Sequence, residues 1–524
     1  KEKSVAQEDT HPPSPPITSD TKAKKQDLKP VQSDHVYPSG LKLVLLMISI
    51  FVGMFLVSLD KLIISTAIPQ ITNEFHAAND IGWYGSAYLL ANCAFLLVFG
   101  KIYTISSIKA TFCQLSYSLK WAQLSAVRHR TQSLSSLVGP LPAWELEVFS
   151  LALYIVIIVF AVPLHKRPQY QGFFGAIFGI ASVLRPLLGG TFTTSVTWRW
   201  CFYINLPLGG VVIVFVFFLL HIPDRPETKI PFKDKLQQLN TMGFLTLVSA
   251  VVCLCLALQW GGTIYTWRKV RIIALLVLSF VLLITFGLIQ CWKPDQATVP
   301  PRFFMQRSIA SGFWVSCCAG AHQTLFIYYL PVWFQAIDSN SAVESGIHIL
   351  PMVLALVFAS ILTGILTSRI GYYMPFLIFG ICITSVGAGL LTTLGIHTAM
   401  GQRVGYQILY GYGVGSYSQA PNMAAQTVLP RSEVSIGISV ILFAQTLFGA
   451  IFVSVGQNVL DNQLAKRLTG ISSITPKRLQ TAGVAGILPC LRIISQPWRF
   501  TMTPCVSASK LPSFWLVSPS LVPL

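Results

Sequence analysis

The 524-residue chain contains few charged residues. Asp, Glu, Lys and Arg together make up 11% of it, whereas hydrophobic residues make up 53% and the mean hydropathy is +0.63. In soluble globular proteins about a quarter of the residues are charged. The shortage of charge therefore excludes an ordinary soluble domain and indicates a chain that lies in lipid.

Acidic residues are especially scarce, with 19 Asp and Glu against 37 Lys and Arg. No Asp or Glu follows Asp461, although seven Lys and Arg do. A net charge of +18 is also found in proteins that bind nucleic acid. Here, however, many of the basic residues occupy short loops between apolar segments, where they orient membrane helices, and we expect no nucleic acid.

Sites for catalysis are also missing. The 11 Cys are scattered, largely within apolar segments and without metal-ligand spacing, and we interpret them as small packing residues. The sequence has no G-x-x-x-x-G-K-[ST] motif for binding ATP phosphates and no nucleophile–base arrangement. We therefore expect neither an enzyme nor a bound metal or cofactor.

Apolar runs of close to twenty residues dominate the rest of the sequence. A helix of about twenty residues crosses the ~30 Å hydrocarbon core of a bilayer. So many candidate spans predict a channel or a transporter, because a receptor or an anchor needs far fewer. The candidate spans are 41–59, 82–99, 171–192, 202–220, 239–260, 270–291, 309–330, 343–366, 372–395, 404–424 and 436–456.

Loop charge predicts how these spans are oriented. The loop at 65–80 carries Glu74 and Asp80 without Lys or Arg, whereas the next turn carries Lys101 and Lys109. Cytoplasmic loops favour Lys and Arg, so the N-terminus is predicted inside and the first loop outside. The clearest exception to the later alternation is a basic cluster on the predicted outer side, formed by Arg268, Lys269 and Arg271.

The stretch between residues 109 and 166 departs further from the alternation of loop charge. The loops at 101–109 and 166–167 are both predicted to be cytoplasmic, so an even number of crossings must separate them. Only one good apolar run, 148–164, lies between them, and the residues before it are too polar to span. A single crossing here would invert every later loop against its charge.

Four strings carry motifs of a known family. They are SLDKLIISTAIPQITNEF (58–75), GWYGSAYLLANCAFLLVFGKIYTISSIK (82–109), VPLHKRPQYQGFFGAIFGIASVLRPLLGG (162–190) and TWRWCFYINLPLGG (197–210). Through them the chain resembles the fungal drug:proton antiporters with fourteen helices, the mycotoxin and multidrug efflux pump type within the major facilitator superfamily. The resemblance covers roughly 41–112 and 152–470. It implies an all-α polytopic membrane protein with two six-helix halves, two linker helices and a substrate site near the midplane.

The resemblance also suggests where the written sequence departs from the family. The family has its third and fourth helices and a G-R-A-I-A-G-x-G motif, with an Arg implicated in proton coupling, where this chain has 117–152. Residues 117–152 can be back-translated with permitted codons, and the resulting nucleotide sequence, read in the neighbouring frame, encodes a string that contains GRAIAGLGVGG. The same change of reading frame over 495–523 gives a plausible final membrane span. We interpret both segments as misframed, which disrupts helices 3–4 and 14.

The expected organisation has five parts. The first forty residues are polar and rich in Pro, Ser and Lys, which predicts disorder, and Lys1 suggests that the true start precedes it. The parts are a cytoplasmic tail at 1–40, an N-terminal half at 41–222, a two-helix linker at 223–300, a C-terminal half at 301–458, and an outer loop with the C-terminus at 459–524.

Proton coupling and gating are expected near the first two helices. Asp60 closes the first apolar run, and an intramembrane carboxylate is costly and usually functional. The resemblance implies gating by Gly100, Lys101 and Lys109. The alternatives are that Asp60 caps a helix end beside Lys61, and that the lysines only orient the helices.

The string GIASVLRPLLGG (179–190) resembles the antiporter motif of the fifth helix. Gly179, Pro186, Gly189 and Gly190 match the motif, in which small residues allow neighbouring helices to pack closely. Arg185 stands where the family normally has Gly, and an Arg at mid-span costs about 2.5 kcal/mol or more. This change either inactivates the protein or makes a polar contact of its own.

Polar and aromatic residues in otherwise apolar spans are candidates for a substrate cavity. Such a cavity needs aromatic walls and few polar anchors. The alternatives are hydrogen bonds between packed helices and lipid-facing aromatic rings. The candidates are Asn92, Trp314, His322, Gln323, Tyr328 and Gln445.

The resemblance implies a proton-coupled exporter of small hydrophobic compounds, such as drugs or fungal secondary metabolites, working by alternating access. We expect a monomeric multi-pass protein of the plasma membrane, with the vacuolar membrane as an alternative. The partners are the substrate, protons and the lipid bilayer. Two other functions remain open: a siderophore or basic amino-acid carrier, and a misframed product without activity.

The frame hypothesis makes a direct prediction. Sequencing the transcript across codons 110–155 and 485–524 is expected to give the shifted frame, because the shifted reading recovers the family motif. Reads that support the written frame at both places would remove the hypothesis.

Overall fold

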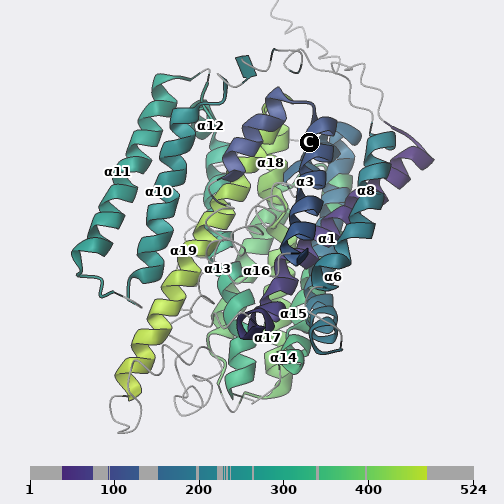
Figure 1. The fold of residues 1–524 in the computed structure, drawn as a ribbon. Coiled ribbons are helices and arrows are strands. Elements are labelled where there is room, and N and C mark those ends of the chain that lie inside the picture. The colour runs from purple at the N-terminus through teal and green to yellow at the C-terminus, as the bar shows by residue number, and fades with distance from the viewer. Residues whose placement is uncertain are drawn as a thin grey trace, which may run out of the picture. The chain divides into compact units, whose positions relative to one another are not determined.

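Helices account for nearly all the regular structure of the described residues (Figure 1). The computed structural model describes residues 38–74, 93, 95–128, 152–195, 200–220, 228, 231, 234–235, 238–262, 265–294, 296–337, 342–395 and 398–468. For 60–74, 119–120, 122–128, 183, 185–187, 189–195, 201–202, 336–337, 342–343 and 460–468 it describes the backbone only. All of these residues belong to one unit, Tyr37–Leu524.

The first half is built around a short, deeply buried helix, Ala152–Ala161, in which Leu153, Ile157 and Ile158 are fully buried. The Arg167 side chain stabilises its C-terminal end by donating from Nη2 to the Val159 carbonyl at 2.7 Å, since a cation is favourable there. The other helices of this half are α1 (Leu41–Glu74), Phe95–Ile105, α3 (Ile108–Arg128), η2 (Leu164–Lys166), α6 (Arg167–Ser195), α7 (Trp200–Tyr203) and α8 (Asn205–Leu219).

The predicted linker helices are α10 (Thr241–Trp260) and α11 (Val270–Trp292), which pack against each other. Helix α10 begins where the Asn240 side chain accepts a hydrogen bond from the Gly243 amide at 3.0 Å, which satisfies a free donor of the first turn. The turn after it uses Gly262 at φ 82°, a conformation that favours glycine. Helix α10 contacts α19, where Asn458 donates to the Leu258 carbonyl at 3.3 Å.

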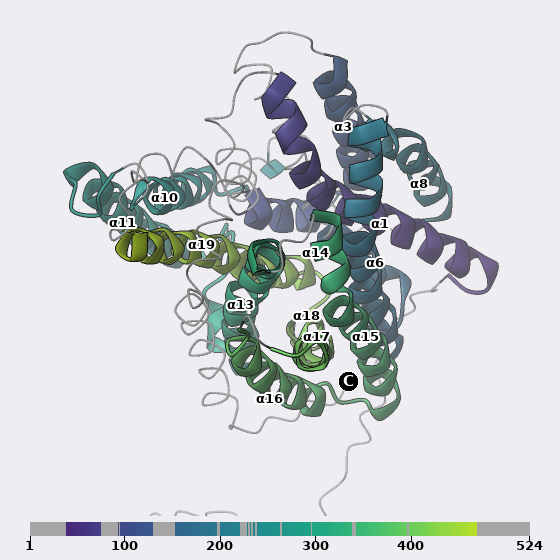
Figure 2. The ribbon, with the colours of Figure 1, turned by 90° about the horizontal axis from the view of Figure 1, so that it is seen from below.

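The second half contains eight helices among the described residues. Proline occupies the first turn of α15, α16 and α18, where its missing N–H costs nothing, and Gly371 ends α15 at φ 83°. Helix α17 packs along both α15 and α16 (Figure 2). The eight are α12 (Arg302–Met305), α13 (Arg307–Ile337), α14 (Ala342–His348), α15 (Leu350–Ile370), α16 (Met374–Leu391), α17 (Met400–Tyr417), α18 (Ala420–Val428) and α19 (Val434–Leu468).

The sequence predicts eleven spans over the whole chain, and the structure tests this number only for the part of the chain that it describes. Among the described residues six helices are long and apolar enough to cross a bilayer: Leu41–Leu59, Thr241–Trp260, Val270–Trp292, Leu350–Ile370, Met374–Leu391 and Val434–Val459. Helices α6 and α13 are also long enough to cross, at about 1.5 Å per residue; α13 contains more polar residues than the six, and α6 is described without a gap in its side chains only as far as Ser182. The expected span 404–424 is divided between α17 and α18.

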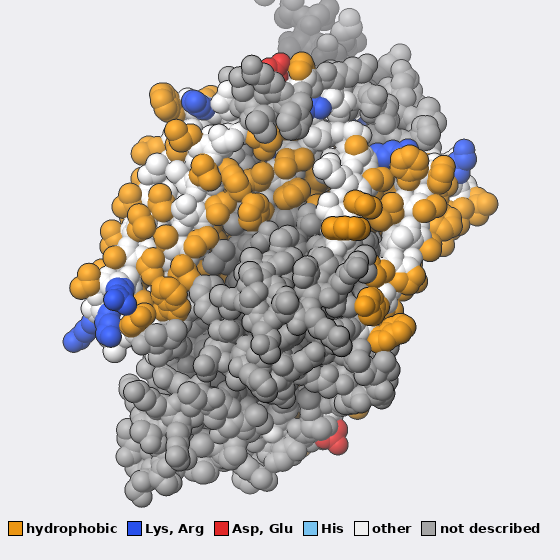
Figure 3. Space-filling view, viewed as in Figure 1, with side chains coloured by type: hydrophobic (Ala, Val, Ile, Leu, Met, Phe, Trp, Pro, Cys, Tyr) orange, Lys and Arg blue, Asp and Glu red, His pale blue; other side chains and the backbone are white. Residues whose placement is uncertain are grey.

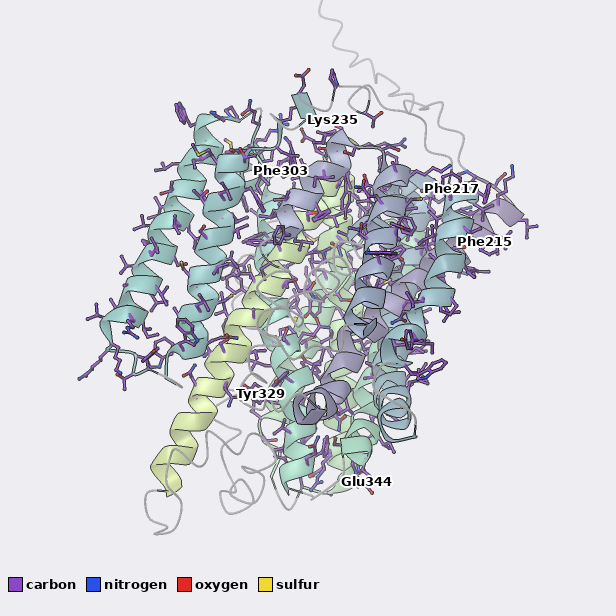
Figure 4. The ribbon with its side chains drawn as sticks, in the orientation of Figure 1. Phe215, Phe217, Lys235, Phe303, Tyr329 and Glu344 are labelled. Carbon is purple, nitrogen blue, oxygen red and sulfur yellow. The ribbon has the colours of Figure 1, made fainter. Side chains whose placement is uncertain are left out.

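Exposed side chains on several helices suit contact with lipid. Large apolar residues such as Phe280, Leu288 and Phe358 are more than half exposed. Figure 3 shows apolar side chains spread over the visible helices, with Lys and Arg gathered toward the ends. Figure 4 labels Lys235 and Phe303 at one end and Glu344 at the opposite end, as the alternation of loop charge requires.

The stretches interpreted as misframed are only partly described. Residues 117–128 continue α3 as a helix, which is not among the six apolar spans. Residues 129–151 and 469–524 lie outside the described residues. The disruption of helices 3–4 and 14 therefore stays a prediction, as do the predicted boundaries of the five parts.

Candidate functional site

Helices α6 and α15 cross in close contact at a seam between the predicted halves. A Cβ atom on Gly172 would lie 2.6 Å from the Ser360 carbonyl oxygen, and one on Gly364 would lie 2.6 Å from the Pro168 carbonyl oxygen. A Cβ on Gly175 would overlap the Ser360 side chain. Glycine is needed at these positions because it lets the two backbones approach.

Two side-chain hydrogen bonds also cross this seam. Ser360 Oγ donates to the Gly172 carbonyl at 3.0 Å, within the buried contact. Ser368 Oγ donates to the His165 carbonyl at 2.7 Å, at the exposed end of the seam. Each bond joins the two halves through a serine hydroxyl and a backbone carbonyl.

Gly179, the first residue of the predicted antiporter motif, belongs to the same seam. A Cβ on Gly179 would overlap the side chain of Val357 and approach that of Val353 at 3.2 Å. Pro186, Gly189 and Gly190 lie further along the α6 backbone, and Arg185 directly precedes Pro186. The side-chain environment of these four lies outside the described residues.

The predicted gating residues lie at a second contact. A Cβ on Gly100 would be 2.5 Å from Ser439 Oγ of α19, so the helix Phe95–Ile105 packs tightly against the second half. Lys101 Nζ donates to the Ala297 carbonyl at 3.2 Å, in the segment that leads into α12. Lys109 lies over the Phe217 ring of α8 at 4.5 Å, within the first half.

Lys101 and Lys109 therefore differ in what they contact. Lys101 links the first half to the segment before α12, whereas Lys109 stays within its own half. Asp60 lies in the α1 backbone, but its side chain is outside the described residues, as is Asn92 altogether.

A group of contacts surrounds the predicted cytoplasmic end of the second half. Arg302 forms an ion pair with Glu433, which precedes α19. Tyr373 precedes α16, and the hydroxyls of Thr427, at the end of α18, and Ser308, at the start of α13, act on it. Burial raises the pKa of the Tyr373 hydroxyl, and these two neighbouring hydroxyls partly oppose the rise.

Inside the second half, His322 is held between two tyrosines of α17. Its Nδ1 lies 2.8 Å from the Tyr410 hydroxyl and its Nε2 lies 2.7 Å from the Tyr417 hydroxyl. The His322 side chain is 3% exposed, and the Phe326 ring packs against Tyr410 at 4.5 Å. Both ring nitrogens of a buried imidazole are thus satisfied by neutral hydroxyls.

The other predicted cavity residues divide into two groups. Gln445 Nε2 donates to Gln323 Oε1 at 3.2 Å, which joins α19 to α13. Trp314 is 38% exposed and Tyr328 is 54% exposed. These two aromatic side chains are about four turns apart on α13 and lie on the same face of that helix. His322 lies on a different face of α13.

Several buried amides have atoms without a hydrogen-bond partner in the described part of the chain. Both amide atoms of Gln171 on α6 and of Gln426 on α18 are in this state, as is Asn422 Oδ1. A small cavity is lined by Pro168 of α6, Thr363 of α15 and further residues of α15, α16, α17 and α18, and these three amides are not part of its lining. Polar atoms without partners between helices suit contact with water or with a passing substrate.

Sequence reasoning missed the partners of the predicted residues. Tyr410 and Tyr417 carry no motif, yet their spacing of seven residues places both on one face of α17, which was a usable signal. Gly172 and Gly175 lie in the quoted string but outside the antiporter motif. Ser360 and Ser439 gave no signal, because the register between distant helices is not visible in a local pattern.

Apolar helices, lipid-facing side chains and close seams between two helical groups define a multi-pass membrane transporter. The model of the Major Facilitator Superfamily matches residues 147–453. An MFS-type transporter of Claviceps purpurea is 46% identical over 461 residues, which cover 86% of this chain and 80% of that protein. The efflux pump roqT of Penicillium rubens is 46% identical, over 80% of this chain and 78% of that protein.

Solved structures show the same fold. The proton:xylose symporter XylE, with 13% identity, gives a TM-score of 0.59 over 91% of this chain and 96% of that chain. The human organic anion transporter MFSD10, with 12% identity, gives 0.58 over 91% and 100%. The chain belongs to the major facilitator superfamily, which confirms the family and the all-α fold expected from the motifs.

The α6–α15 seam predicts how a single methyl group acts. Gly172→Ala places a Cβ against the Ser360 carbonyl oxygen, and overpacking of this kind costs about 1–3 kcal/mol. We expect a lower apparent melting temperature of the protein in detergent. Gly389→Ala in α16 is the matched control, because nothing lies within 4 Å of its Cβ. Equal melting temperatures for the two variants would show that the seam tolerates a side chain.

Proposed function

We propose that this chain exports small hydrophobic compounds in exchange for protons by alternating access. Membership of the superfamily makes it a membrane transporter for small substrates. Two relatives with more than 40% identity, roqT and the MFS-type efflux pump MFS1 of Trichophyton rubrum, are named as efflux pumps. These names support outward transport.

The structural support for alternating access comes from the seam between α6 and α15. Alternating access requires two halves that separate on one side of the membrane while they close on the other. A seam held by glycines and two serine hydrogen bonds, without an ion pair between its described side chains, is suited to opening. Gly100 against Ser439 provides a second contact of the same kind.

The seam residues fall near the predicted cytoplasmic ends of their helices. His165 and Ser368, which are hydrogen bonded, lie at the ends that loop charge assigns to the inside. Lys101, bonded to the Ala297 carbonyl, is predicted on the same side. Separation at these contacts would let a compound enter from the cytoplasm.

We base the proposal of a hydrophobic substrate on the types of residue that the helices of the second half contain. Among the described residues of the second half, the Asp, Glu, Lys and Arg lie near helix ends or in connections. The interior instead offers the Gln323–Gln445 pair and aromatic rings. Few polar anchors among apolar walls suit a lipophilic compound better than a siderophore or a basic amino acid.

The remaining features of the proposal extend the sequence analysis. Protons supply the energy through Asp60, with Gly100, Lys101 and Lys109 at the gate and the 179–190 motif at the seam. The protein works as a monomer in the plasma membrane, with the five-part organisation described above, and catalyses no covalent chemistry.

Efflux of a lipophilic dye tests the function. Yeast cells that express the chain are loaded with rhodamine 6G, and we expect faster loss of the dye than from cells with empty vector. Collapse of the proton gradient with a protonophore is expected to slow the loss to the background rate. Export that continues at the same rate after collapse would contradict proton coupling.

The role of Asp60 is tested by substitution. Asp60→Asn removes the ionisable group with little change in shape, so we expect gradient-driven export to fall to the rate seen with protonophore. Asp461→Asn, beyond the apolar span of α19, is the matched control and is expected to export normally. Surface labelling checks that both variants reach the membrane. Normal export by Asp60→Asn would assign that carboxyl to helix capping.

A further inference from the structure

His322 is an ionisable residue inside the second half to which the proposed function assigns no proton. It lies near the middle of α13 and is 3% exposed. An ionisable side chain within a membrane span is costly and usually has a function. The charged residues of the described second half lie elsewhere, near helix ends or in connections: Arg302, Arg307, Glu344, Arg369, Arg403, Arg431, Glu433, Asp461, Lys466 and Arg467.

The hydrogen bonds of the His322 ring depend on its protonation. A neutral imidazole has one N–H donor and one acceptor nitrogen. With Tyr410 at Nδ1 and Tyr417 at Nε2, one tyrosine donates to the ring and the other accepts from it. An imidazolium donates from both nitrogens, so the tyrosine that donated must turn its O–H elsewhere and accept instead.

We infer that His322 carries a proton during the transport cycle and that the hydroxyls of Tyr410 and Tyr417 respond to its protonation. A hydronium ion in water on the outer side gives up a proton, with its O–H bond breaking, to the lone pair of the unprotonated ring nitrogen, where an N–H bond forms as the donating tyrosine turns away. The ring gains one positive charge. The same bond breaks when the proton leaves to cytoplasmic water, so no electrons are exchanged. This inference rests on the proposed function and names a second proton-binding residue for it.

The surroundings of His322 contain little to compensate that charge. From α17 it meets Tyr410 and Tyr417, and Cys318 lies one turn away on α13 itself. The described side chains of α18, and those of the apolar span of α19, include no titratable group.

The charged and titratable groups of α12 and α14 lie toward the two ends of α13. Glu344 and His348 of α14 lie toward the outer end, where His348 stacks on Phe334, and Arg302 of α12 lies near the opposite end. An imidazolium would thus be poorly stabilised while dry, and protonation favours a state in which water enters between α13 and α17.

Helix α17 connects this change to the seam. Its glycines pack directly on the neighbouring backbone: a Cβ on Gly411 would overlap the Met352 carbonyl, and one on Gly415 would overlap the Leu356 carbonyl. A tightly packed contact moves as one body, so a shift of α17 acts on α15. Helix α15 carries Ser360, which donates to Gly172 across the seam. The ring of His322 and the seam are therefore joined through two helices in contact.

Proteoliposomes containing the full chain test the inference with tetraphenylphosphonium, a cation whose charge does not change with pH. The membrane potential is clamped at zero, and the lumen is one pH unit more acidic than the medium. If one proton exchanges per cation, the gradient supports up to about tenfold accumulation, because each 1.4 kcal/mol corresponds to tenfold. Counterflow of labelled against unlabelled cation, at equal pH on both sides, measures transport that needs no coupling.

His322→Gln keeps hydrogen-bonding groups but cannot take a proton. We expect its accumulation ratio to fall to about one while counterflow stays within about twofold of wild type, since only coupling is lost. Tyr417→Phe, which removes one acceptor for the imidazolium, is expected to lower the ratio and keep counterflow. Tyr329→Phe is the matched control, because this tyrosine of α13 instead donates to the Val453 carbonyl of α19 at 3.1 Å; its ratio is expected to match wild type.

Each of the other possible outcomes contradicts the inference about His322. Wild-type accumulation by His322→Gln overturns the inference, and so does loss of counterflow in a monodisperse protein, which would make His322 a substrate contact. If His322→Gln aggregates, an unchanged ratio in Tyr417→Phe overturns the inference. If the wild-type protein shows counterflow without accumulation, or shows neither, the proposed proton-coupled function is wrong. The inference about His322, which rests on that function, is then wrong as well.

Discussion

The arrangement of this protein depends on close backbone contact between helices that lie in lipid. Lipid tails are as apolar as leucine, so the hydrophobic effect that joins helices in water gives little here. Association then relies on packing and on hydrogen bonds between helices. The chain meets this demand with Gly172 and Gly364 at the α6–α15 seam, and with Gly411 and Gly415 where α17 meets α15. Ser360 adds a hydrogen bond at the point where these contacts meet.

The sequence predicted the class of fold well, because the length and hydropathy of each span are local properties. Helices α10, α11 and α16 lie close to their expected ranges. Helix α13 was expected as a span but is less apolar than the six strongest, since it carries polar residues such as His322 that face the interior. Lower hydropathy in a long helix is itself a sign of an interior role.

The site was predicted less completely. Family motifs pointed to Gly100 and Gly179, and both lie at contacts between the halves. Their partners, Ser439 and Val357, are more than 170 residues away in the chain, and only the packed structure sets that pairing. His322 was selected as a polar residue in an apolar span, whereas the tyrosines that hold it become apparent only when α13 and α17 are brought together.

Transport requires that no single state is too stable, and the buried polar groups have this effect. A buried polar atom without a partner costs about 1–3 kcal/mol, and Gln171 and Gln426 each have both amide atoms in this state. The glycine seams favour the closed contact, while the amides gain hydrogen bonds if opening admits water. These opposing contributions bring the open and closed states closer in free energy. A proton on His322, or a compound that binds one state better, can then shift the balance with only a small difference in free energy.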